Sequence, residues 1–155
     1  MPADEELTLA EEEAALVAAE ATELTAALSG ARREAALRLA EAARNGEPIP
    51  EDLLDLLQGL AVLTLQTGRA RRQAGAHGEK LWTQILLRTA RGRELKNEIA
   101  SVNRALQALV GRRIEAVHVE MRTLGHFALT LGCQGVTITL AMRADGVRVE
   151  SVSAG

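Results

Sequence analysis

The last part of the chain, which decides the fold, reads VHVEMRTLGHFALTLGCQGVTITLAMRADGVRVE over residues 117–150. Apolar and polar residues alternate along it in four runs, and a period of two is typical of half-buried β-strands. Three short glycine-containing breaks, at residues 124–126, 132–135 and 144–146, separate the runs. Breaks of this length fit hairpin turns. Residues 112–155 are therefore predicted to form a small four-stranded antiparallel β-meander.

The alternation also predicts which side chains share a face of this sheet. Pairing Met121 with Leu129, Leu129 with Ile138 and Leu140 with Val149 places every large apolar side chain on one side. A sheet with one apolar face has to cover it, either with residues 95–110 of the same chain or with a second copy. The residues expected on this oligomerisation face are Val117, Val119, Met121, Phe127, Leu129, Leu131, Ile138, Leu140, Leu106 and Leu109.

The part of the chain before the sheet is predicted to be helical. Ala and Leu recur there in a seven-residue pattern that is typical of a coiled-coil seam. The first helical arm is expected over residues 8–45, where Gly46 and Pro48 end it. The second arm is expected over residues 51–110, after Pro50.

Two long helices joined by a short turn favour an antiparallel hairpin, here over residues 1–111. The predicted fold class is therefore α+β, a long coiled-coil-like hairpin followed by the β-meander. Residues 66–78 leave an alternative open, because they hold Gly68, Gly75 and Gly78 and no large aliphatic residue. Each glycine costs a helix interior about 1 kcal/mol. We expect one long or slightly kinked helix, with a break in this stretch as the alternative.

Charge is segregated between the two predicted arms. Residues 1–58 hold 14 acidic and 4 basic residues, whereas residues 59–113 hold 3 acidic and 11 basic residues. In a hairpin these charges would face each other, with Glu20 and Glu23 opposite Arg71 and Arg72. The acidic residues 4–6 would then lie near Arg88, Arg91 and Arg93.

The alternative is that the basic arm binds the phosphates of DNA. Arg104, Arg112 and Arg113 lie beyond the reach of the first arm and are the first candidates for an external anion. The candidates nearer the first arm are Arg88, Arg91 and Arg93. Binding of this kind would be independent of the base sequence, because the sheet offers no exposed aromatic residues for stacking.

Nothing in the sequence indicates catalysis. His118, Glu120 and Arg122 share one face of the first strand, but a solvated strand produces such polar rows by default. The three histidines lack ligand spacing, and the single Cys133 excludes a cysteine cluster. We therefore predict no catalytic residue, metal, cofactor or small-molecule substrate. The acidic N-terminus and the lack of long apolar runs favour a cytoplasmic protein without membrane contact.

The sequence therefore predicts a non-catalytic, homo-oligomeric interaction or scaffold protein. The hairpin would act as a spacer or docking surface, and the β head would mediate self-association or partner binding. The expected partners are a second copy of the chain, in a homodimer, and an unidentified protein. One alternative is a nucleoid protein or a DNA-damage-associated protein that binds DNA independently of the base sequence through the basic second arm. Another is an export or assembly chaperone that binds an exposed helix of its partner.

Overall fold

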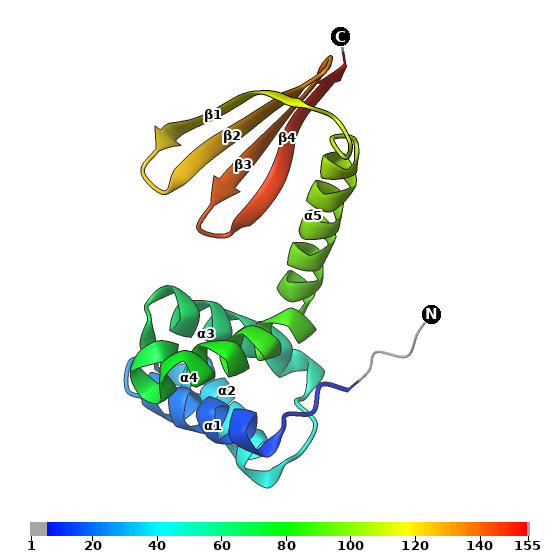
Figure 1. Cartoon of the computed structure of the whole chain (residues 1–155). Coiled ribbons are helices and arrows are strands. Elements are labelled where there is room, and N and C mark those ends of the chain that lie inside the picture. Colours follow the sequence, from blue (N-terminus) through cyan, green and yellow to red (C-terminus); the bar gives the residue numbers. More distant parts are fainter. Residues whose placement is uncertain (1–5, 155) are drawn as a thin grey trace. The chain divides into compact units, whose positions relative to one another are not determined.

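The structure is a computed structural model that describes residues 6–154 (Figure 1). It contains helices followed by a four-stranded antiparallel sheet, which confirms the α+β class. The chain divides into two compact units, Met1–Gly92 and Arg93–Gly155, here called the helical unit and the β unit. This division lies before the boundary at residues 111 and 112 drawn from the sequence, because most of the last helix belongs with the sheet that it covers.

The helical unit does not form the predicted long hairpin. Each predicted arm is interrupted and folds back on itself, so that α1 packs mainly against α2, and α3 packs mainly against α4. Its elements are α1 (Glu11–Leu24), α2 (Gly30–Asn45), the short 3-10 helix η1 (Glu51–Leu53), α3 (Leu54–Gln66) and α4 (Arg69–Arg88). The two uninterrupted arms over residues 8–45 and 51–110 are therefore not confirmed.

Glycines mark the breaks within the helical unit. Gly68 adopts a left-handed conformation (φ 68°) between α3 and α4, and Gly75 (φ 59°) kinks α4. Glycine takes such conformations without the steric cost that a Cβ would add. The expectation of one long helix through residues 66–78 was therefore wrong, and the alternative of a break is what the structure shows. The predicted stop at Gly46 is confirmed, since it caps α2 with φ 67°.

The core of the helical unit is closed and built around one aromatic side chain. Trp82 is fully buried, together with large aliphatic residues from α1, α2 and α3 such as Val17, Leu39 and Leu57. Alanines fill the remaining positions of this core and allow the helices to approach closely. Burial of this kind drives short helices to pack on one another rather than to extend.

Opposite charges pair between α1 and α4, as the charge segregation predicted. The buried Glu20 carboxylate lies 3.1 Å from Nε of Arg69. Its hydrogen bond and its charge raise the pKa of Arg69. The buried Glu13 carboxylate lies 2.5 Å from Nη2 of Arg88.

The particular partners differ from those predicted. Glu20 and Glu23 both contact Arg69 rather than Arg71 and Arg72, because the break at Gly68 changes the register of the second arm. Of the acidic residues 4–6 that were expected near Arg88, Arg91 and Arg93, residues 4 and 5 lie outside the described part of the chain.

The β unit is a meander in which neighbours in sequence are neighbours in the sheet (Figure 1). Helix α5 (Ala90–Gln107) precedes it. The strands are β1 (Ile114–Thr123), β2 (His126–Cys133), β3 (Val136–Arg143) and β4 (Gly146–Ala154). The four predicted strands and their antiparallel order are confirmed.

The register of the sheet agrees with the prediction in one pair of strands. Leu140 lies opposite Val149, as expected. Met121 lies opposite Phe127 and Leu129 opposite Leu140, so the pairings of Met121 with Leu129 and of Leu129 with Ile138 were wrong by two residues. The cause is that the first two turns are two residues long, which is shorter than the breaks read from the sequence. A shift of two residues keeps every side chain on its predicted face.

Candidate interaction surface

Helix α5 covers only part of the apolar face of the sheet. Val102 of α5 and Ile138 and Leu140 of β3 are buried together. The partly buried residues around them belong to α5, the turn that follows it, β2, β3 and β4. No residue of β1 belongs to this cluster. Ile138 and Leu140, both predicted on the oligomerisation face, are therefore inaccessible beneath α5. Leu106, Leu109 and Leu129 pack against the same cluster and are only partly exposed.

The other part of this face is open. Val117, Val119 and Met121 of β1 remain 60%, 55% and 63% exposed, and Phe127 of β2 remains 38% exposed. We call these four residues the open half of the face. All four were predicted to lie on the oligomerisation face, as was Leu131, which is half-buried between the two regions. Apolar side chains gathered in this way mark interaction surfaces more often than isolated exposed ones do.

A flank of α5 extends the exposed apolar surface, and the sequence reasoning missed it. Ile99 is 51% exposed although it lies one turn from the buried Val102. On the helix, Glu98 lies on the other side of Val102 and forms an ion pair with Arg148 of β4, Nε to Oε1, at 3.2 Å. Ile99 therefore projects on the side away from β4. The seven-residue spacing between Ile99 and Leu106 was the available signal.

Ion pairs lie on the polar face of the sheet. Arg122 of β1 lies 3.0 Å from Glu120 on the same strand and 3.1 Å from Glu150 of β4. The small side chains of Ala128 and Ala141, which lie between these strands, are buried. His118, the third residue of the predicted polar row, is exposed on β1. Two residues of the row, Glu120 and Arg122, therefore belong to an ion-pair network.

The two edges of the sheet are unlike each other. At β4, the Glu98–Arg148 ion pair ties the strand to α5. At β1, every one of the 10 residues is exposed. Within residues 6–154, β2 is the only strand that pairs with β1. An edge of this length presents unpaired N–H and C=O groups to any strand that approaches it.

The predicted anion-binding arginines are divided between the two units, and three of them contact groups of their own unit. Arg88 donates to the Thr8 carbonyl and to Glu13. Arg112 donates to the Gln134 carbonyl at 3.1 Å, and Arg113 lies 3.9 Å from Glu115. Arg104 is exposed on α5. Arg91 and Arg93 fall on either side of the division between the two units.

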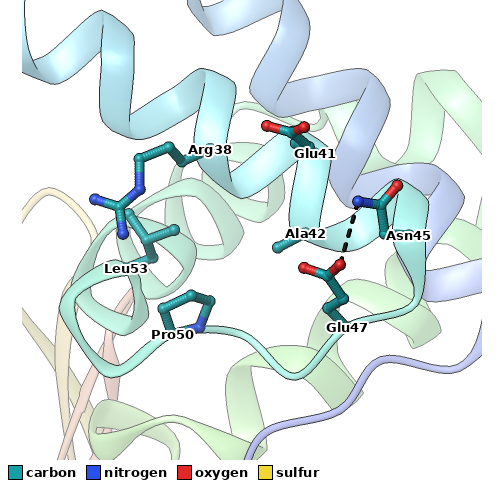
Figure 2. A pocket seen from close by; sticks show the side chains of 7 residues that line it. All are labelled: Arg38, Glu41, Ala42, Asn45, Glu47, Pro50 and Leu53. Carbon is teal, nitrogen blue, oxygen red and sulfur yellow. Dashed lines mark hydrogen bonds between the residues drawn. The ribbon is translucent and has the colours of Figure 1, made fainter.

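A shallow hollow in the helical unit lies between α2 and η1 (Figure 2). Arg38 on its rim binds the Asp52 carboxylate through two hydrogen bonds of 2.8 and 3.2 Å. The hydrogen bond and the charge of Asp52 raise the pKa of Arg38. Asn45 donates to Glu47 at 3.3 Å at one end of the same hollow. Arg38 and Asn45 are thereby each paired with a carboxylate, and nothing in the hollow points to a ligand.

The remaining candidates for chemistry are dispersed. The Cys133 thiol is buried at the end of β2 rather than exposed in a turn. His126 lies 3.3 Å from Nε of Arg143, and His77 lies 2.9 Å from Glu12. In the part of the chain that the structure describes, no group of three His, Cys, Asp or Glu side chains could hold a metal ion.

Comparison with known proteins adds no function. No protein-family model matches the chain, no curated protein matches it, and no solved structure matches it. None of the helices within residues 6–154 combines the length and the apolar character that crossing a membrane requires.

Proposed function

We propose that this chain is a non-catalytic interaction protein that self-associates through its β unit and thereby acts as a scaffold. The observation that carries the proposal is the open half of the sheet face, next to a β1 edge that no other strand pairs with in residues 6–154. Burying half-exposed Val, Met and Phe side chains releases about 25 cal/mol for each Å² of apolar surface. A β unit that binds a second copy would gain this free energy, which one copy alone cannot obtain.

The helical unit contributes differently to this proposal. Its core is closed, and its α1 and α4 charges are paired within the unit. Each copy of an oligomer would therefore carry a folded helical unit as a module for a further protein partner. We place this role in the cytoplasm, because a single buried cysteine offers no disulfide framework for an oxidising compartment.

The test is light scattering coupled to size-exclusion chromatography at micromolar concentration. We expect the wild-type chain to elute as a dimer and Val119→Lys to elute as a monomer, because the lysine places a charge in the open half. The matched control is Leu124→Lys. Leu124 is 95% exposed in the β1–β2 turn, so this variant should remain a dimer. A wild-type chain that stays monomeric at micromolar concentration would contradict the proposal.

Sequence-independent DNA binding is the second candidate, and the exposed Arg104 together with Arg112 and Arg113 supports it. The partners of Arg112 and Arg113 are a single carbonyl and a carboxylate at 3.9 Å, which leaves both guanidinium groups able to approach a phosphate. It predicts retention of a short duplex that weakens steeply with salt. Changing all three arginines to Ala should then abolish retention at low salt. A dimer that does not bind the duplex at low salt would exclude DNA binding as a function of these arginines.

A further inference from the structure

The two edges of the sheet differ in how they are protected. β4 is tied to α5 by the Glu98–Arg148 ion pair. Gly146, at its start, lies so close to α5 that an added Cβ would be 3.2 Å from Cδ2 of Leu95. β1 has no such cover among the described residues, and its sequence contains neither Pro nor Lys, the residues that commonly block edge pairing.

We propose that a second copy of this chain pairs antiparallel along β1, about a two-fold axis that passes beside Val119. The inference rests on the proposed self-association and specifies where it takes place. The two sheets would become one continuous sheet, with β1 of each copy at its centre. The N–H and C=O groups on the outer side of β1 would then form hydrogen bonds with the second copy. If this edge packed against a protein surface that is not a strand, the same groups would lose water without gaining partners.

Alternation along β1 restricts the registers that such a pair can adopt. Opposed residues in an antiparallel pair lie on the same face, so the apolar sides of both copies coincide only in every second register. Centring on Val119 places Val117 opposite Met121 of the second copy. The same register places His118 opposite Glu120 of the second copy. Apolar residues then oppose apolar ones, and an imidazole opposes a carboxylate on both sides of the axis. The Glu120 carboxylate also contacts Arg122 of its own strand at 3.0 Å, and its two oxygens allow it to accept from both groups.

The neighbouring registers that keep the faces aligned are less favourable. Centring on Glu120 would place this carboxylate opposite its own copy, and like charges directly opposed destabilise a sheet. Centring on His118 would place this imidazole opposite itself and would oppose Glu120 to Ala116. The His118–Glu120 complementarity therefore selects the register centred on Val119.

The regular part of β1 has the length that this pairing needs. Its pairing with β2 is unbroken from Ala116 to Met121 and shifts register on either side, between Ile114 and Ala116 and between Met121 and Thr123. Bulges of this kind bend a strand and end its pairing. The register centred on Val119 matches residues 117–121 of one copy with the same residues of the other, all within the regular part. The pairing is the same for both copies, so the assembly closes as a dimer.

Edge pairing would also bring the two open halves together. Val117, Val119 and Met121 of both copies would lie side by side on one face, with an α5 helix over the more distant strands of each copy. Neighbouring side chains of the two copies would cover part of one another's apolar surface, and the rest of the joined surface would stay available to the further protein partner of the scaffold.

A pair of cysteine variants tests the register. His118→Cys and Glu120→Cys change exposed side chains on the polar face. Glu120→Cys also removes the ion pair with Arg122, but this pair is exposed and adds little stability, so neither variant should disturb the fold. We expect the two variants, mixed and mildly oxidised, to form a disulfide-linked heterodimer. Each variant alone should form several-fold less, because like positions are displaced by two residues along the strands, beyond the Cα separation that a disulfide spans. The wild-type chain is the control for Cys133, which is buried.

The other outcomes are separable. Strong self-linking of His118→Cys or of Glu120→Cys would replace the proposed register with one centred on that residue. A dimer by light scattering without any linkage would contradict edge pairing and leave self-association through the open half standing, because face-to-face packing keeps positions 118 and 120 far from the second copy. A monomer by light scattering would contradict both this inference and the proposed function.

Discussion

The helical unit and the β unit bury their apolar residues in different ways. The helical unit surrounds Trp82 completely and encloses even two carboxylates, Glu13 and Glu20, each paired with an arginine. The β unit closes its apolar face over Ile138 and Leu140 and leaves Val119 and Met121 more than half exposed. A unit that satisfies its own side chains contributes stability, whereas a unit that leaves apolar side chains open depends on another molecule to cover them. Under the proposed function, the helical unit mainly contributes folding stability and the β unit mainly contributes recognition.

The largest expected effect that follows from this comparison is in the helical core. Trp82→Ala should lower the stability of the helical unit by about 3–5 kcal/mol, because it removes a fully buried aromatic side chain and leaves a cavity. Chemical denaturation followed by circular dichroism would measure the loss. Trp82→Phe is the matched control. It should cost much less, because Nε1 of Trp82 is buried without a hydrogen-bond partner within residues 6–154, so no hydrogen bond is lost. Small losses in both variants would show that the indole ring does not fill the core.

A second prediction compares the covered and open parts of the same sheet face. Ile138→Ala should destabilise the β unit by about 2–5 kcal/mol, because Ile138 is fully buried beneath α5. Val117→Ala, at a residue that is 60% exposed, should change the stability of the monomer by about 0.5 kcal/mol or less. Hydrogen exchange of the β3 amide groups in dilute protein would measure both.

Val117→Ala should instead weaken self-association, which dilution experiments by light scattering would detect. If the two substitutions reduced amide protection equally, β1 would be covered within the monomer, and the distinction between the covered and open parts of the face would be lost.

The comparison also shows what could be predicted from the sequence. The strands, their order and their faces follow from local alternation, since residues 117–150 repeat one period with short turns. The breaks in the helical arms do not follow from any local pattern. The residues around Gly30 and Gly68 are compatible with either a bent or a broken helix, and the free energy that favours folding back comes from Trp82 and its distant neighbours. Long-range burial of this kind leaves no local pattern.

The candidate surface was predictable only in part, for a related reason. Alternation places Val119, Met121 and Ile138 on one apolar face. It does not show which part of that face α5 covers, because this depends on the side of α5 that holds Leu106 and on the ion pair of Glu98 with β4. The exposed flank at Ile99 follows from the same packing and was missed.

The smallest of the predicted effects concerns the chain at the end of the helical unit, where Gly92 packs tightly. A Cβ at this position would overlap the backbone of Leu86 and Leu87, and backbone atoms cannot move aside as the end of a flexible side chain does. Gly92→Ala should therefore destabilise the helical unit by about 1–3 kcal/mol.

The matched control is Gly59→Ala in α3, where a Cβ would meet nothing within 4 Å and the backbone is helical. There the substitution should stabilise the protein by about 0.4–1 kcal/mol, because alanine loses less conformational entropy on folding. Fluorescence of Trp82, the only tryptophan, reports unfolding of the helical unit in both variants. Opposite shifts of the denaturation midpoint would confirm that the helical unit is tightly closed at Gly92. If both substitutions stabilised the protein, a Cβ at Gly92 would fit without a clash. The closed packing at Trp82 would then not extend to the end of the helical unit.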